Sequence, residues 1–149
     1  MYLRDNAFYV PQTLYETAVF IDTAAFIDIE LQNSTAISCK EQIDSLAIPV
    51  YTTHLIVAET YNRLLYDHSN TIAFSFLKKL LNSKIVILEH NKEVSYLAKD
   101  LIKQFWDLNL SFCDAVSSVI MMNSGIYKIF TFDISHFQAL GFITVPPYY

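Results

Sequence analysis

The sequence predicts an α/β fold, a three-layer α/β/α arrangement around a central, mostly parallel sheet of four to five strands. Short apolar runs of strand length alternate with helical segments of ten or more residues, which is the pattern of βαβ units. The composition is 53 % hydrophobic with 2 Gly and 4 Pro, which predicts a packed core with short loops. A length of 149 residues fits one domain.

The first half of the chain contains two of the expected strands. Ala18–Ile21 is a continuous apolar run, typical of a strand buried on both faces, and Ile48–Tyr51 is the next. A helix is expected near Thr35–Leu46 between them, and another at His54–Tyr66, for which Thr53 is a suitable N-cap. The residues expected to share the buried side of this second helix are Leu55, Ala58, Asn62 and Leu65.

The second half is expected to alternate in the same way. Its predicted strands are Lys84–Leu88, Ile129–Phe132 and Phe142–Val145. Its predicted helices run from Asn70 or Thr71 to Leu81, over Lys92–Phe105 behind an Asn91 cap, from Ser111 or Asp114 to about Met122, and over Ser135–Leu140. Gly125 is expected to end the third of these because glycine tolerates a positive φ. Residues 1–16 are predicted to be an N-terminal extension, and residues 17–149 a single domain.

Charge, hydropathy and cysteine content exclude several classes of protein. The apolar runs are shorter than the roughly 18 residues of a membrane span, and the N-terminus does not resemble a signal peptide, so we expect a cytoplasmic protein without membrane contact. A net charge of −5 argues against a protein that grips a nucleic-acid duplex, but less against an enzyme that meets phosphate through a bound cation. Cys39 and Cys113 lack metal-site spacing and are expected to be reduced and buried.

Four acidic residues are candidates for one shared site: Asp22, Glu59, Asp114 and Asp133. Each has an ordinary alternative, because the aspartates precede helices or turns, where Asp is a favoured cap, and Glu59 suits a solvated helix face. Asp22 and Asp133 nevertheless follow predicted parallel strands, whose carboxyl ends meet at one edge of a sheet. Clustered carboxylates repel one another unless a cation joins them, and oxygen ligands select Mg²⁺ or Mn²⁺. Such ions support phosphodiester hydrolysis.

Four segments resemble the motifs of the PIN domain family. In chain order they are Phe20–Ile27, Val57–Thr60, Leu110–Ala115 and Thr131–Phe137. Their order and spacing most resemble the VapC-type toxin ribonucleases of bacterial and archaeal toxin–antitoxin pairs, over residues 18–147. One departure is Ala24, where the family often has Ser, which removes a supporting hydrogen bond.

The resemblance implies an endoribonuclease that depends on Mg²⁺ or Mn²⁺, with the four acids around the ion. Asp22 and Asp114 would be the firmest ligands, and Glu59 and Asp133 would bind directly or through water, or orient the attacking water. The hydroxyl residues expected in support are Thr23, Ser111 and Thr131. The resemblance further implies an RNA substrate, a homodimer, and a protein antitoxin that covers the site.

Two alternatives stay open: a non-catalytic PIN module that binds protein, and an RNA-processing nuclease outside any toxin pair. Among other residues, Asp28 and Asp107 are expected on solvated helix faces, and His136 in packing or on polar surface. Trp106 is expected in the core or an interface, ahead of a base-stacking role. The scarce positive charges available for RNA contact include Arg63, Lys78, Lys79 and Lys103.

Overall fold

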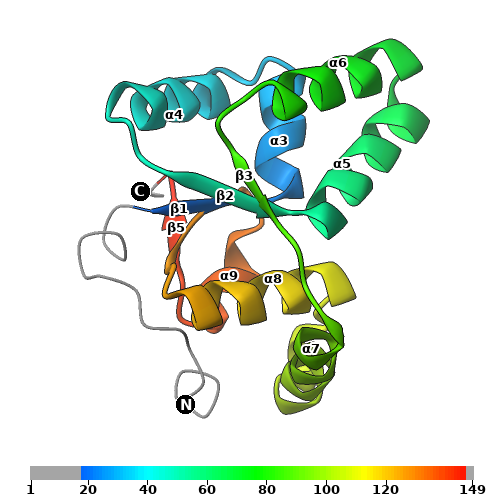
Figure 1. Ribbon diagram of the computed structural model, residues 1–149, viewed down its shortest axis with the longest axis vertical. Coiled ribbons are helices and arrows are strands. Elements are labelled where there is room, and N and C mark those ends of the chain that lie inside the picture. The colour runs from blue at the N-terminus through cyan, green and yellow to red at the C-terminus, as the bar shows by residue number, and fades with distance from the viewer. Residues whose placement is uncertain (1–17, 147–149) are drawn as a thin grey trace.

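The computed structural model describes residues 18–146 and has three layers, with helices on both faces of one sheet (Figure 1). The strands are β1 (Val19–Ile21), β2 (Val50–Thr53), β3 (Val86–Leu88), β4 (Lys128–Phe130) and β5 (Ile143–Val145). They lie in the order β3-β2-β1-β4-β5, and all four pairings are parallel. The predicted fold class is therefore confirmed. The expected N-terminal extension, residues 1–16, lies outside the described residues.

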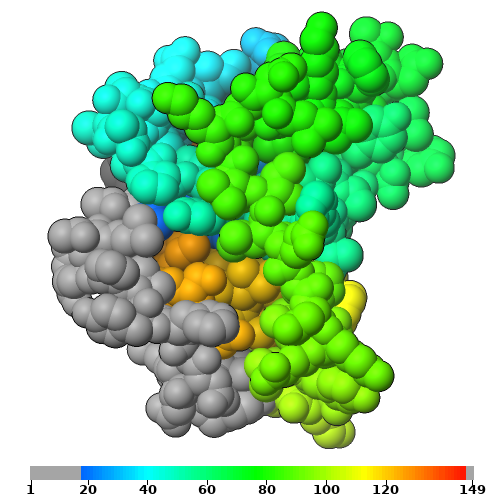
Figure 2. All heavy atoms as spheres, viewed as in Figure 1, coloured from blue at the N-terminus to red at the C-terminus, as the bar shows by residue number. Residues whose placement is uncertain are grey.

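The helices divide between the two faces of the sheet (Figure 1). One layer contains α3 (Thr23–Glu30), α4 (Ser34–Ser45), α5 (His54–Asp67) and α6 (Asn70–Leu81). The other contains α7 (Lys92–Gln104), α8 (Phe112–Ser124) and α9 (Ile134–Ala139), with the 3-10 turn η1 (Trp106–Leu108) between α7 and α8. In the space-filling view the segment around β3 crosses the front of the molecule and continues to α7 (Figure 2). Within residues 18–146, no helix has the length and apolar character of a membrane span.

Side-chain caps explain where most helices begin. The capping residues, whose side chains accept a hydrogen bond from the backbone N–H three positions on, include Asn33, Thr53, Ser69, Asn91 and Ser111. The predicted Thr53 and Asn91 caps are confirmed. Helix α6 begins at Asn70, one of its two predicted starts, and Ser69 caps it. Helix α8 is capped by Ser111, the first of its two predicted starts, and not by Asp114. Gly125 ends α8 in the left-handed conformation, with φ 71°, as predicted.

The strands are displaced by up to two residues from their predicted positions. The run Ile48–Tyr51 was expected to be a strand because it is apolar, whereas β2 starts at Val50 and continues through two threonines. Thr52 can lie inside the sheet because its hydroxyl donates to the carbonyl oxygen of Ile21 at 3.0 Å. Similarly, β3 begins at Val86, two residues after its predicted start, and β4 ends at Phe130, two residues before its predicted end at Phe132. Apolar character marked the presence of each strand, and hydrogen bonding set its ends.

The buried face of α5 differs from the predicted one. Ile56, Thr60 and Leu64 are buried, whereas Ala58 and Asn62 of the predicted set are exposed. At about 100° per residue, the predicted set is centred on the opposite side of the helix from the buried set. The reason is that α5 contacts α3 and α6 as well as β2, so the other predicted members, two leucines, are only half-buried. Glu59 consequently lies half-buried at the border of the packed face.

The two central strands place the site. All of β1 is buried, and so are Ile129 and Phe130 of β4. From β1 the chain continues to β2 on one side, whereas β4 pairs on the other side. The connections that leave the carboxyl ends of β1 and β4 therefore diverge and create a crevice, which is where open α/β sheets bind ligands.

Candidate metal centre

A pocket of about 630 Å³ lies at this crevice. Its lining includes all four predicted acids, Asp22, Glu59, Asp114 and Asp133, each from a different part of the chain. Arg63 is the one lysine or arginine among the described residues that line it. The pocket is therefore strongly anionic, and a cation is the kind of ligand that it suits.

Asp22 lies at the centre of the sheet edge and is 5 % exposed. It caps α3, since its Oδ1 accepts from the Ala25 N–H at 3.3 Å, and its Oδ2 accepts from the Thr131 hydroxyl at 2.7 Å. The pKa of this carboxyl is raised from 3.8 to about 7, chiefly by burial; the nearby Asp114 and Asp133 charges also raise it, and the two hydrogen bonds lower it. Asp22 therefore both caps α3 and lines the pocket.

Glu59 reaches the pocket from the second turn of α5. The Thr23 hydroxyl donates to its Oε2 and joins α5 to the first residue of α3. This bond links two of the resemblance-based motifs through side chains 36 positions apart. It also holds the carboxylate in one orientation at the pocket wall.

Asp114 lies in the first turn of α8, where the Ser111 hydroxyl accepts from its backbone N–H at 3.0 Å. The negative side chain is favourable at this end of a helix. Burial raises the pKa of the Asp114 carboxyl, and Asp133 and Glu59 raise it further, whereas His136 lowers it. The three predicted hydroxyl residues therefore each bond to a predicted acid, although their supporting role stays a prediction.

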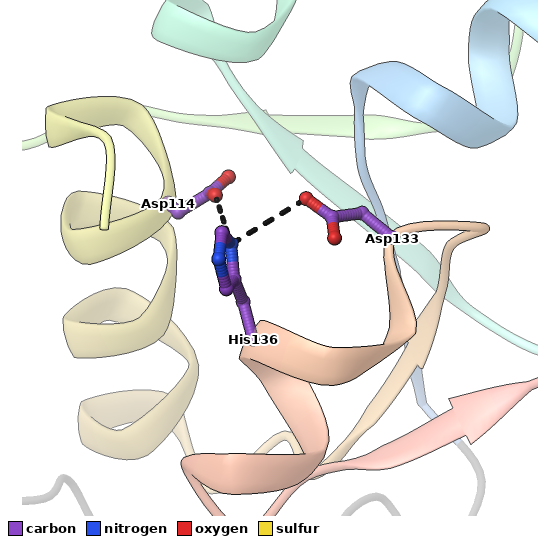
Figure 3. A group of neighbouring side chains, drawn as sticks. All are labelled: Asp114, Asp133 and His136. Atoms are coloured by element: carbon purple, nitrogen blue, oxygen red, sulfur yellow. Dashed lines mark ion pairs between the residues drawn. The ribbon is translucent and has the colours of Figure 1, made fainter. Parts of the chain in front are cut away.

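Asp133 and His136 form the tightest part of the site together with Asp114. His136 Nδ1 lies 3.6 Å from Asp114 Oδ2 and 3.6 Å from Asp133 Oδ2. Figure 3 shows the imidazole ring, carried by α9, pointing between the two carboxyl groups. One possible ligand atom from each of the three residues lies within 4.8 Å of the others. Nδ1 is buried and, within residues 18–146, has no hydrogen-bond partner.

The sequence prediction did not assign His136 to the site, and it expected Asp28 on a solvated face. Both line the pocket, as does Arg63, whereas Asp107 is exposed and lies outside it. The missed signal was helical spacing: His136 follows Asp133 by three positions and Arg63 follows Glu59 by four, which places each pair on one helix face.

The donor set fits a hard divalent cation. Carboxylate oxygens are the preferred ligands of Mg²⁺ and Mn²⁺, and a cation would stabilise the charged form of Asp22, whose pKa is raised chiefly by burial. His136 Nδ1, which contacts the Asp114 and Asp133 carboxylates without a hydrogen bond, adds one nitrogen donor to a set that was expected to contain only oxygen. Asp22, Glu59, Asp114, Asp133 and His136 are thus the residues that could hold an ion.

Cysteine takes no part in this donor set. Both cysteines are free, Cys39 being buried and Cys113 half-buried. Burial raises the pKa of the Cys113 thiol, and the neighbouring Glu59 charge raises it further, so the thiol stays protonated at neutral pH. A protonated thiol is neither a good nucleophile nor a good ligand.

Comparison with known proteins matches most of the chain to one family. The sequence profile of the PIN domain matches residues 19–143, which contain every residue of the pocket. Among curated proteins the sequence finds no match.

Solved structures of toxin proteins have the same fold. One is VapC20 from Mycobacterium tuberculosis, described as a sarcin–ricin loop cleaving toxin; it is 21 % identical with a TM-score of 0.77, covering 87 % of this chain and 100 % of that one. Another is VapBC2 from Rickettsia felis, solved with a DNA fragment from its promoter; it is 12 % identical with a TM-score of 0.67, covering 85 % and 96 %. At these identities the likeness shows a shared fold.

Proposed function

This chain belongs to the PIN domain family, and we propose that it is a divalent-metal-dependent endoribonuclease, the toxin of a toxin–antitoxin pair. The observation that carries the proposal is the convergence of four carboxylates and one imidazole in a single pocket at the sheet edge. Phosphodiester hydrolysis needs no protein nucleophile when an ion provides the activated water. The Thr23 and Ser111 hydroxyls that line the pocket are engaged in hydrogen bonds with Glu59 and with the backbone N–H of Asp114.

Each residue of the pocket has a role in the proposed hydrolysis. When bound, Mg²⁺ or Mn²⁺ supplies a Lewis acid for the phosphate and lowers the pKa of a water molecule. Asp22 and Asp114 would hold the ion, and the Thr131 and Ser111 hydroxyls fix the two elements that carry them. Glu59 and Asp133 would bind the ion directly or through water, or orient the attacking water. Arg63, at the rim, offers the substrate phosphates a positive charge.

The toxin assignment rests on the family resemblance and on the fold shared with a toxin described as cleaving the sarcin–ricin loop. A homodimer and a protein antitoxin follow from the same resemblance. A pocket so rich in carboxylates suits an inhibitor that inserts a cationic side chain in place of the ion or the phosphate.

Removal of the metal tests the proposal most directly. We expect purified protein to cleave single-stranded RNA internally in Mg²⁺ or Mn²⁺, and cleavage to fall to background in EDTA and return when the ion is added back. The product of a small gene beside this one should suppress cleavage by forming a stable complex. Equal cleavage with and without EDTA would contradict the metal-dependent mechanism.

Replacement of His136 tests whether imidazole belongs to the ligand set. Nitrogen donors favour transition ions over Mg²⁺, so we expect His136→Asn to weaken Mn²⁺ binding by about tenfold or more and Mg²⁺ binding much less. Isothermal calorimetry with each ion gives both affinities. Ser135→Ala, an exposed neighbour outside the pocket, serves as the control. An equal loss for both ions would assign His136 a general electrostatic role.

A further inference from the structure

A second hollow lies beside the metal centre, between the end of α7 and the start of α8. It measures about 580 Å³ and is lined by Lys99, Asp100, Ile102, Lys103, Trp106 and Phe112. Trp106 is 67 % exposed and Phe112 is 47 % exposed, so of the two places expected for Trp106, the core or an interface, the core is excluded. In Figure 2 the end of α7 lies at the surface of the lower part of the molecule.

Lysines lie over the aromatic rings of this surface. Lys103 Nζ is 5.2 Å from the centroid of the Trp106 ring. Lys99 Nζ is 5.2 Å from the centroid of Tyr96, one helical turn earlier, and also pairs with Asp100 at 3.3 Å. Each ring therefore has a positive charge over one of its faces, in a protein whose net charge is −5.

The hollow adjoins the metal centre through consecutive residues. Phe112 lines the hollow, and the preceding Ser111 lines the acidic pocket. On the other side, η1 carries Trp106 and is followed by Asn109, which turns in the left-handed conformation, with φ 52°, and lines the pocket. A strand of nucleic acid whose phosphate lies in the pocket would thus meet Phe112 and Trp106 within a short distance along its path.

We infer that this surface, formed by Lys99, Lys103, Trp106 and Phe112, binds the single-stranded RNA next to the scissile phosphate; the inference rests on the proposed ribonuclease function. Bases stack on exposed aromatic rings whatever their sequence, and neighbouring lysines contact the phosphates. The acidic pocket repels RNA on its own account, so substrate affinity has to come from a surface outside it.

A second copy of this chain fits the surface less well. An interface between copies would take the ammonium groups of Lys99 and Lys103 out of water, with Asp100 as the one carboxylate in the hollow to compensate them. Burial of a charge without a partner is costly. RNA supplies a phosphate for each lysine and a base for each ring.

Trp106 reports on its own binding because it is the single tryptophan of the chain. In the cleavage-impaired Asp22→Asn protein with Mg²⁺, we expect a short single-stranded RNA to quench tryptophan fluorescence in a saturable, salt-sensitive way. With RNA labelled at one end, fluorescence anisotropy should show that Trp106→Ala and Lys103→Ala each weaken binding by about five- to tenfold or more. Trp106→Phe should restore most of the affinity. Tyr66→Ala, which removes an 81 % exposed aromatic residue of α5, should bind as the parent does.

The cleavage assay separates this inference from the proposed function. In the otherwise native protein, Trp106→Ala should raise KM for single-stranded RNA by a similar factor and leave kcat nearly unchanged. If Trp106→Ala and Lys103→Ala both bind and cleave RNA as the native protein does, the surface is not an RNA site, while the ribonuclease function stands. If RNA binds and depends on Trp106 but no cleavage occurs with any ion, the proposed function fails and the binding surface stands. A dimer that Trp106→Ala converts to monomer, with unchanged RNA affinity, would overturn the inference in favour of a second copy.

Discussion

Asp22→Asn should reduce RNA cleavage by at least about a hundredfold, beyond the range for residues that only support a ligand. Asparagine has nearly the same shape and can still accept from the Ala25 N–H, so the cap of α3 and the fold persist. What is lost is the negative charge that holds the ion beside β1. Cleavage rates under saturating RNA, with calorimetry for Mg²⁺ affinity, measure the effect. Asp107→Asn, an exposed aspartate outside the pocket, is the matched control. Native-like cleavage by Asp22→Asn would remove Asp22 from the mechanism.

The same substitution should stabilise the metal-free protein at alkaline pH. The pKa of Asp22 rises from 3.8 to about 7 in the fold, so the proton is bound more tightly there than in the unfolded chain. Stability that is present below about pH 4 is therefore lost as the pH rises through 7, by up to roughly 4 kcal/mol. Asp22→Asn does not undergo this loss, and the difference in unfolding free energy between the two proteins should grow across this window.

Urea unfolding at several pH values, with and without Mg²⁺, tests this expectation. Mg²⁺ should stabilise the native protein more at pH 8 than at pH 5, because protons compete with the ion for the carboxylate. In Asp22→Asn this pH-dependent gain should be much smaller. If the unfolding free energies of the two proteins change in parallel between pH 4 and pH 8, the pH-dependent loss of stability does not come from Asp22.

The sequence contained enough information for the layers and the sheet, because alternation of apolar runs with helical periods reports directly on burial. The sequence predicted less well which residues are buried where one element packs against several others. The buried side of α5 was predicted on the opposite face because α3 and α6 pack against this helix as well as β2, and a single sequence does not reveal those contacts. The end of β2 was misplaced because Thr52 finds a partner in the Ile21 carbonyl, which belongs to another strand.

The same distinction applies to the site: residues at strand ends were predicted, and a residue positioned by packing between helices was not. Asp22 and Asp133 were placed correctly at one sheet edge because strand ends impose it. The contacts between Thr131 and Asp22, and between Thr23 and Glu59, matched residues singled out by the family resemblance. His136 was not predicted as a site residue because its position depends on how α9 packs relative to α8, which the sequence alone does not reveal. Its spacing from Asp133 was visible, but a single histidine on a short helix has many ordinary uses.

The bond between Thr131 and Asp22 joins residues 109 positions apart, which has a consequence for how the protein acquires its activity. Closing so long a loop is entropically costly and slow, and it occurs late compared with the local pairing of neighbouring elements. During synthesis, β1 and α3 leave the ribosome long before β4. A nascent chain therefore holds no complete site until residues 128–133 have emerged and the last central strand has docked. If the proposed ribonuclease function holds, cleavage cannot begin until translation of the domain is nearly finished.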